Sequence, residues 1–159
     1  AEVAALNTAV SDQTLDHTLA REARARGLKV LLAEDSATAV AQVRETLSEL
    51  GLELIAVQDG LKALRQLQAW VAEGKRVTDE VVMLITDAEM PEMDGYRLTA
   101  EIRQSVDFGD LHVVIHTSLS GGFNQAMVSK VGCDAFLSKF APDELASVVQ
   151  ARLKAYLNL

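Results

Sequence analysis

The sequence predicts an α/β fold in which helices cover both faces of a parallel sheet. Three observations lead to this prediction: short apolar runs recur along the chain, a segment of helical periodicity follows each run, and glycine or proline residues separate many of these segments. Apolar runs of about four to eight residues are typical of strands that are buried on both faces. Strands that alternate with helices in this way form parallel sheets.

The first half of the chain contains two strand–helix units. The apolar run 28–33 predicts the first strand, and Ser36 is a preferred N-cap residue in front of a helix. Gly51 is expected to end that helix, since glycine readily adopts the left-handed conformation found after a helix C-terminus. Residues 52–57 predict the second strand, and the helix that follows it is expected to end at Gly74.

The second half of the chain continues the alternation. Three further apolar runs predict strands over residues 81–86, 112–117 and 134–138. Helical periodicity predicts helices over residues 95–104, from a glycine-rich loop to about residue 131, and from 142 to 157. Right-handed crossovers leave few topologies for such a chain. We expect a flavodoxin-like, doubly wound (βα)5 sheet with the strand order 2-1-3-4-5.

Residues 1–27 precede this alternation and have a different pattern. Leu15, Leu19 and Ala23 form a thin apolar stripe at helical spacing, which predicts an extra N-terminal helix. We interpret residues 1–27 as a helical linker or as the end of an upstream domain, and residues 28–159 as the folded domain.

Charge and composition argue against several functions. The formal net charge is −8 and no basic cluster offsets it, which argues against binding to nucleic acids or to anionic membranes. No apolar run approaches the roughly 20 residues that a membrane-spanning helix needs, so membrane insertion is not expected. Cys133 is the only cysteine, so an internal disulfide is excluded and a reducing, cytoplasmic location is expected.

Acidic residues follow two of the predicted strands. Glu34 and Asp35 end the first strand and Asp87 ends the third, and these two strands are neighbours in the predicted order. Three carboxylates in one crevice repel each other and raise each other's pKa values. A divalent cation relieves that repulsion, and Mg²⁺ suits a site with few carboxylates and several waters. The sequence therefore predicts a Mg²⁺ site at this edge of the sheet.

Two further residues reach the same edge. Thr117 ends the fourth strand and Lys139 follows the fifth. A hydroxyl group and an ammonium group beside carboxylates and Mg²⁺ suit a phosphoryl group, because they hydrogen-bond to its oxygens and neutralise them. A carboxylate can itself be the nucleophile, and Asp87 is the best candidate because it lies at the centre of the crevice. His116, within the fourth strand, is expected to be packed rather than catalytic.

The motifs at the strand ends resemble those of response-regulator receiver domains, the CheY-like family. They read LLAEDS, LITDAEMPEMDGYRL, VVIHTS and FLSKF, and the resemblance extends over residues 28–157. It implies that Asp87 accepts a phosphoryl group from a histidine kinase. It also implies a switch rather than a turnover enzyme, since such a domain assists only its own phosphorylation and dephosphorylation.

The resemblance also assigns the ligands of the metal. Asp35 and Asp87 would bind Mg²⁺ directly, together with the backbone carbonyl oxygen of Glu89. Glu34 would act through a water molecule.

Thr117 and Lys139 would contact the phosphoryl group, and Phe136 would be the aromatic switch residue whose rotamer is coupled to Thr117. One feature departs from the family, in which a proline in a cis bond usually follows the lysine. Here Phe140 follows Lys139 and the proline is residue 142. We expect either a trans bond with a shifted loop or a retained cis bond, which costs about 2.5–4 kcal/mol without proline.

A closer resemblance is to the receiver domain of the CheV family of chemotaxis coupling proteins. The segments LLAEDSATAV, TDAEMPEMDGY and DAFLSKFAPDEL carry it. It implies that a CheW-like domain precedes the receiver and that residues 1–27 are the connecting segment. It also implies that the chemotaxis kinase CheA supplies the phosphoryl group.

Three alternative functions stay open. The first is a stand-alone CheY-type regulator whose output is binding to another protein. The second is a receiver fold that is not phosphorylated and serves only as a docking module. The third is a Mg²⁺-dependent phosphatase of the haloacid-dehalogenase type, but its DxD motif begins near the first strand, whereas Asp87 follows the third.

Overall fold

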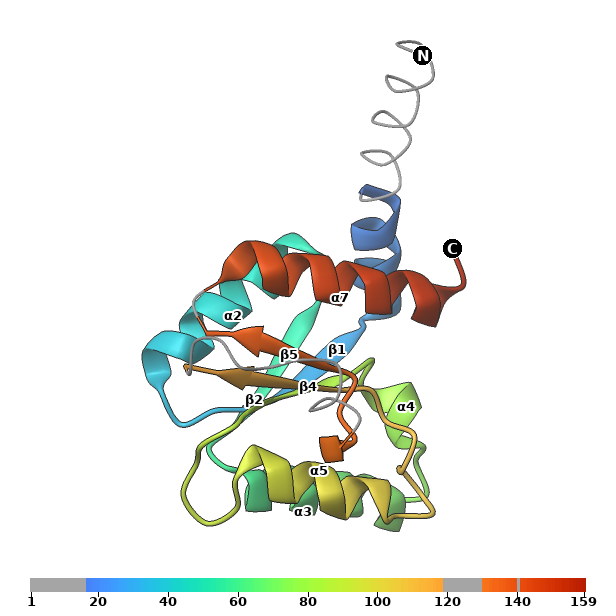
Figure 1. The fold of residues 1–159 in the computed structure, drawn as a ribbon. Coiled ribbons are helices and arrows are strands. Elements are labelled where there is room, and N and C mark those ends of the chain that lie inside the picture. The colour runs from blue at the N-terminus through green and yellow to red at the C-terminus, as the bar shows by residue number, and fades with distance from the viewer. Residues whose placement is uncertain (1–16, 119–129, 140) are drawn as a thin grey trace.

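A five-stranded parallel sheet forms the centre of the molecule (Figure 1). The computed structural model describes residues 17–118, 130–139 and 141–159. The strand order is β2-β1-β3-β4-β5, which confirms the predicted order and the doubly wound α/β fold. The strands are β1 (Lys29–Ala33), β2 (Glu53–Val57), β3 (Leu84–Asp87), β4 (Val113–Thr117) and β5 (Ala135–Ser138).

Helices cover both faces of the sheet. They are α2 (Ala37–Glu49), α3 (Gly60–Ala72), α4 (Val77–Glu80), α5 (Gly95–Arg103) and α7 (Pro142–Leu157). Helices α3 and α5 lie on one face, and α2 and α7 lie on the other (Figure 1). Within the described part of the chain, no helix combines the length and the apolar character needed to cross a membrane.

Alternate residues of the central strands enter two separate hydrophobic cores. Leu84 of β3 packs in the core beneath α3 and α5, whereas Ile85 packs in the core beneath α2 and α7. Both side chains are fully buried. Successive side chains of a strand point to opposite faces, so a strand between two layers of helices is apolar at every position. This explains why the central strands read as continuous apolar runs.

The third strand begins later than the sequence predicts. The apolar run predicts a strand over residues 81–86, but β3 spans Leu84–Asp87. The short helix α4, which the sequence did not predict, precedes it and ends at Glu80. Val81, Val82 and Met83 are apolar because they are buried rather than because they belong to the strand. The prediction was wrong because burial and strand formation produce the same apolar run.

The predicted helix ends are largely confirmed. The Oγ atom of Ser36 accepts a backbone hydrogen bond of 3.3 Å at the start of α2. Gly51 and Gly74 follow α2 and α3 with φ angles of 80° and 82°. The helix expected to end near residue 131 falls mostly on residues 119–129, outside the described residues, although residues 130–131 are helical.

A helix of residues 17–26 packs against the domain, as the sequence predicts for its N-terminal region. Leu19 and Ala23 are buried in the same core as α2 and α7. A Cβ atom at Gly51 would collide with the carbonyl oxygen of Ala20. The C-terminal end of α2 therefore fits closely against this helix, and only glycine fits at that contact.

We predict that Gly51→Ala destabilises the domain more than Gly74→Ala does. Both glycines have a positive φ, which costs an alanine roughly 1 kcal/mol. Only at Gly51 does the added Cβ atom meet another part of the chain. Urea unfolding should show a loss of about 1 kcal/mol for Gly74→Ala and at least about 2 kcal/mol for Gly51→Ala. Equal losses of stability in the two variants would show that helix 17–26 does not pack closely against the C-terminal end of α2 in solution.

Candidate functional site at the carboxyl edge of the sheet

Three carboxylates gather where β1 and β3 end. These strands are neighbours, with Ala33 paired to Thr86, so Glu34 and Asp35 come directly beside Asp87. Each of the three acids offers an oxygen atom, and these atoms lie within 4.8 Å of one another. Glu34 and Asp87 are buried, at 2% and 4% exposed, whereas Asp35 is exposed. The parallel register thus brings the acids together.

The ammonium group of Lys139 lies between two of these acids. Lys139 directly follows β5, and its backbone N–H donates a hydrogen bond of 2.7 Å to the carbonyl oxygen of Thr117. Its Nζ atom donates a hydrogen bond of 2.8 Å to Oδ2 of Asp87 and one of 3.1 Å to Oε1 of Glu34. The side chain of Lys139 is 11% exposed. The three groups therefore form a buried ionic cluster, which joins the ends of β1, β3 and β5.

Burial and ion pairing act in opposite directions on the protonation of this cluster. Burial raises the pKa of Glu34 above its usual value, although hydrogen bonds from Lys139 and from the backbone of Ser36 oppose the rise. Burial also disfavours the charge on Lys139, but its hydrogen bonds to Asp87 and Glu34 outweigh burial and raise its pKa. Lys139 is therefore charged at neutral pH, and its single positive charge is shared by Glu34 and Asp87, with Asp35 as a third acid beside them.

The donor set fits a hard divalent cation. Nζ of Lys139 lies 3.1 Å from Oε2 of Glu34, but within residues 17–118, 130–139 and 141–159 no hydrogen bond satisfies this buried oxygen. Mg²⁺ prefers oxygen ligands and commonly keeps several waters. A water molecule held by the ion is the kind of donor that Oε2 lacks. Asp35 and Asp87 are the carboxylates that would hold the ion directly.

The chain turns sharply after Asp87. The backbone N–H of Glu89 donates a hydrogen bond of 3.3 Å to Oδ1 of Asp87, and that of Gly95 donates one of 3.0 Å to the carbonyl oxygen of Ala88. A Cβ atom at Gly95 would collide with the carbonyl oxygen of Asp87. Asp94 then caps the first turn of α5. The loop is thus held against the strand end, which restricts the position of the Asp87 carboxylate.

Thr117 and Phe136 lie on β4 and β5. Thr117 ends β4, is 1% exposed, and pairs in the sheet with Ser138. The ring centroid of Phe136 lies 6.3 Å from that of Tyr96 on α5. Both residues are therefore near the edge at which the sequence places them, and their roles stay predictions. Phe140 lies outside the described residues, so the expectation for the Lys139–Phe140 peptide bond stays a prediction.

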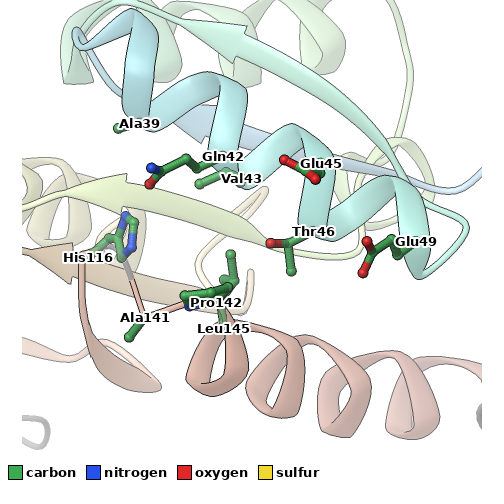
Figure 2. Close-up of a pocket in the computed structure, with 10 residues that line it drawn as sticks. All are labelled: Ala39, Gln42, Val43, Glu45, Thr46, Glu49, His116, Ala141, Pro142 and Leu145. Atoms are coloured by element: carbon green, nitrogen blue, oxygen red, sulfur yellow. The ribbon is translucent and has the colours of Figure 1, made fainter.

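His116 is a buried residue of this region for which sequence reasoning predicted only packing. It pairs with Asp87 between β4 and β3 and is 4% exposed. Its pKa is lowered to about 4, chiefly by burial and also by the charge of Lys139, while the charge of Asp87 opposes both. Its Nδ1 atom has no hydrogen-bond partner in the described part of the chain. Figure 2 shows the ring near the start of α7, on the side of the sheet that faces α2.

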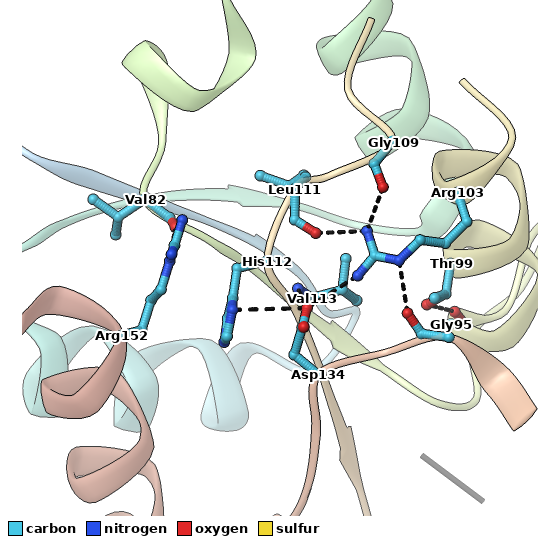
Figure 3. Close-up of polar contacts among 11 residues, drawn as sticks. Val82, Gly95, Thr99, Arg103, Gly109, Leu111, His112, Val113, Asp134 and Arg152 are labelled. Carbon is cyan, nitrogen blue, oxygen red and sulfur yellow. Dashed lines mark hydrogen bonds and ion pairs between the residues drawn. The ribbon is translucent and has the colours of Figure 1, made fainter. Parts of the chain in front are cut away.

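A second set of polar contacts lies around the amino ends of β4 and β5 (Figure 3). The guanidinium group of Arg103 donates hydrogen bonds of 2.6–3.0 Å to the carbonyl oxygens of Gly109, Leu111 and Gly132 and to the carboxylate of Asp134. These bonds join α5 to the loops that precede both strands. Because the guanidinium is used within the fold, we interpret this set as structural.

Comparison with known proteins identifies the class. The sequence profile described as the response regulator receiver domain matches residues 30–150, so the chain belongs to that family. This confirms the predicted CheY-like family. Receiver domains of two-component and chemotaxis response regulators are phosphoacceptor switches rather than turnover enzymes. They generally bind Mg²⁺ at an acidic site.

Two relatives and one solved structure illustrate the similarity. Chemotaxis protein CheV1 of Helicobacter pylori is 28% identical over 125 residues, which cover 79% of this chain but only 38% of CheV1. Chemotaxis protein CheY1 of the same species is 30% identical over 127 residues, which cover 79% of this chain and 97% of CheY1. The signal receiver domain of a signal transduction histidine kinase from Syntrophus aciditrophicus superposes with a TM-score of 0.66 at 29% identity, covering 80% of this chain and 90% of that one.

We predict that Lys139→Gln lowers the free energy of unfolding by about 3 kcal/mol in Mg²⁺-free buffer, because it leaves Asp87 and Glu34 buried without a cation. Lys75→Gln is the matched control, since its ion pair with Glu73 is exposed and its loss should change stability little. Urea unfolding of both variants measures the difference. Unchanged stability of Lys139→Gln would contradict the ionic cluster.

We also predict that His116 makes the domain less stable in acid. Its pKa falls from 6.5 to about 4 on folding, so the unfolded chain takes up the proton first. The stability that neutral His116 contributes is complete above about pH 6.5 and is lost as the pH falls towards 4. Between neutral pH and about pH 4.5, wild type should lose about 2–3 kcal/mol more than His116→Leu does in urea unfolding. The same pH dependence in both proteins would show that His116 is not protected in the folded state.

Proposed function

We propose that this chain is a phosphorylation-controlled switch of chemotaxis two-component signalling, in which Asp87 accepts a phosphoryl group from a CheA-like histidine kinase. The observation that carries the proposal is the 2.8 Å contact between Asp87 and Lys139, within a group of three converging acids. Membership of the receiver family supports the same reaction.

Asp87 would act as the nucleophile of the reaction. One of its carboxylate oxygens attacks the phosphorus atom of a phosphohistidine, the P–N bond breaks, and its electron pair stays with the imidazole that leaves. The product is an aspartyl phosphate. Bound Mg²⁺ would supply charge neutralisation for the phosphoryl oxygens. Asp35, Asp87 and the backbone carbonyl of Glu89 would hold the ion, with Glu34 acting through water.

Lys139 has two roles in this proposal. Before phosphorylation its ammonium group holds the Asp87 carboxylate in place, and afterwards it neutralises an oxygen of the phosphoryl group. Thr117 would donate its hydroxyl hydrogen to another phosphoryl oxygen. Phe136 would change rotamer with Thr117 and so carry the signal to the surface.

The similarity to CheV1 supports a coupling protein in which a CheW-like domain precedes the receiver, with residues 1–27 as the connection. The similarity to nearly the whole of CheY1 favours the alternative of a stand-alone regulator. Both functions would place the chain in the cytoplasm, where CheA-type kinases supply the phosphoryl group. The two differ in their output, since the first acts on its own coupling domain and the second binds another protein.

To test whether Asp87 is the acceptor, the purified chain is incubated with acetyl phosphate in the presence of either Mg²⁺ or EDTA. A phosphate-affinity gel should show a shifted band with Mg²⁺ and none with EDTA. Asp87→Asn should abolish the band, because the amide is not a nucleophile. Asp107→Asn makes the same substitution at an exposed acid and should retain the shifted band.

Phosphorylated CheA is the second donor in this experiment. Transfer to wild type but not to Asp87→Asn would support the kinase as partner. If neither donor labels a folded protein, the proposal is wrong and the unphosphorylated docking module takes its place.

A further inference from the structure

A cavity of about 390 Å³ lies between α2 and the start of α7 (Figure 2). Apolar groups from both helices form part of its wall, among them Val43 and Leu145. None of the described residues of the carboxylate–lysine cluster lines it. Its volume falls in the range of small-molecule sites, which are roughly 300–1,000 Å³. The cavity is therefore a second concave site beside the candidate phosphorylation site.

The imidazole of His116 is the buried polar group of this cavity. It is 4% exposed, and its Nδ1 atom has no hydrogen-bond partner within the described residues. An uncompensated buried polar atom costs free energy, so such an atom beside a cavity indicates a missing partner. A neutral imidazole keeps one nitrogen as an acceptor and does not repel a cation.

The charged groups around the cavity are all acidic. Glu45 and Glu49 line it from α2, and none of its described lining residues is a lysine or an arginine. Gln42 lies on the same helix towards His116, and Glu49 lies at the other end (Figure 2). Glu49 follows Gln42 by seven positions, which corresponds to roughly 10 Å along the helix axis. The cavity thus has a hydrogen-bond acceptor, His116, at one end and the carboxylates of Glu45 and Glu49 towards the other end. Apolar side chains line the space between them.

We propose that this cavity binds a linear aliphatic polyamine, which lies along α2. One ammonium group donates hydrogen bonds to the imidazole of His116 and the side-chain oxygen of Gln42. The methylene chain packs on Val43 and Leu145, and a second ammonium group faces Glu45 and Glu49. A triamine spans the groove better than a short diamine, since the two ends are far apart.

This inference does not depend on the proposed phosphoryl transfer. No residue that lines the cavity holds the acceptor, the metal or the phosphoryl group in that proposal. Failure of polyamine binding would therefore leave the phosphorylation of Asp87 untouched, and failure of phosphorylation would leave this site untouched.

An NMR titration of the full chain with spermidine tests the proposal, at roughly 0.15 M ionic strength to screen weak surface attraction. Saturating Mg²⁺ is present so that the acidic cluster is not free for the amine. Backbone amide shifts should concentrate on α2 and on the first turn of α7, together with the ring of His116. Ethylenediamine is too short to reach both ends, butylamine has a single ammonium group, and 1,4-butanediol has none, so each should bind at least about tenfold more weakly.

Variants separate this site from the general negative charge of the chain. Glu45→Gln/Glu49→Gln should weaken spermidine binding at least about fivefold. Glu53→Gln/Glu101→Gln removes the same charge from β2 and α5, away from the cavity, and should bind as wild type does. His116→Leu should also weaken binding while retaining the fold by circular dichroism.

Three results would overturn the proposal. Equal weakening by the two glutamate pairs would mean only general attraction to an acidic protein. Binding that Asp87→Asn abolishes would place the amine at the carboxylate cluster instead. Equal affinity for spermidine and butanediol would reduce the cavity to an apolar crevice without a cation site.

Discussion

The ion pairs that Lys139 forms with Asp87 and Glu34 are the interactions on which the candidate site depends. They lie among groups that are 11% exposed or less, where an unpaired charge is costly. Each of the three residues stands at the end of a different strand, so the pairing holds only if β1, β3 and β5 keep their parallel register. The same pairing leaves an excess of carboxylate, and this excess makes the edge suitable for a divalent cation.

The position of this chemistry follows from the burial of the sheet on both faces. Between its two layers of helices, a central strand has room only for apolar side chains over most of its length. Polar groups can therefore enter the sheet only where a strand ends, and the acids, Thr117 and Lys139 are all found there. Two residues are polar one position before a strand end. The first is Thr86 of β3, whose hydroxyl donates a hydrogen bond to the carbonyl oxygen of Asp87. The second is His116 of β4. Its unsatisfied nitrogen is the cost of that position, and the adjoining cavity is where a partner would fit.

Helix α2 connects three features of the molecule. Its N-cap Ser36 donates a backbone hydrogen bond of 3.1 Å to Oε1 of Glu34, at the carboxylate cluster. Its middle lines the cavity beside His116. The glycine that follows its C-terminal end, Gly51, lies against Ala20 of helix 17–26. One rigid element thus touches the candidate site, the cavity and the segment that leads into the domain.

The sequence by itself determined the order of strands and helices, most helix ends, and which acids stand at the strand ends. It could do so because buried strands, amphipathic helices and N-cap residues each produce a recognisable pattern among residues that are close together in the sequence. Only the tertiary structure decided that β3 begins at Leu84 after α4, because an apolar run does not separate buried coil from strand. It alone paired Lys139 with Glu34, which lies 105 residues away in the chain. It alone left Nδ1 of His116, beside a cavity, without a hydrogen-bond partner among the residues that the structure describes. These features arise from contacts between distant segments, which no local pattern of residues records.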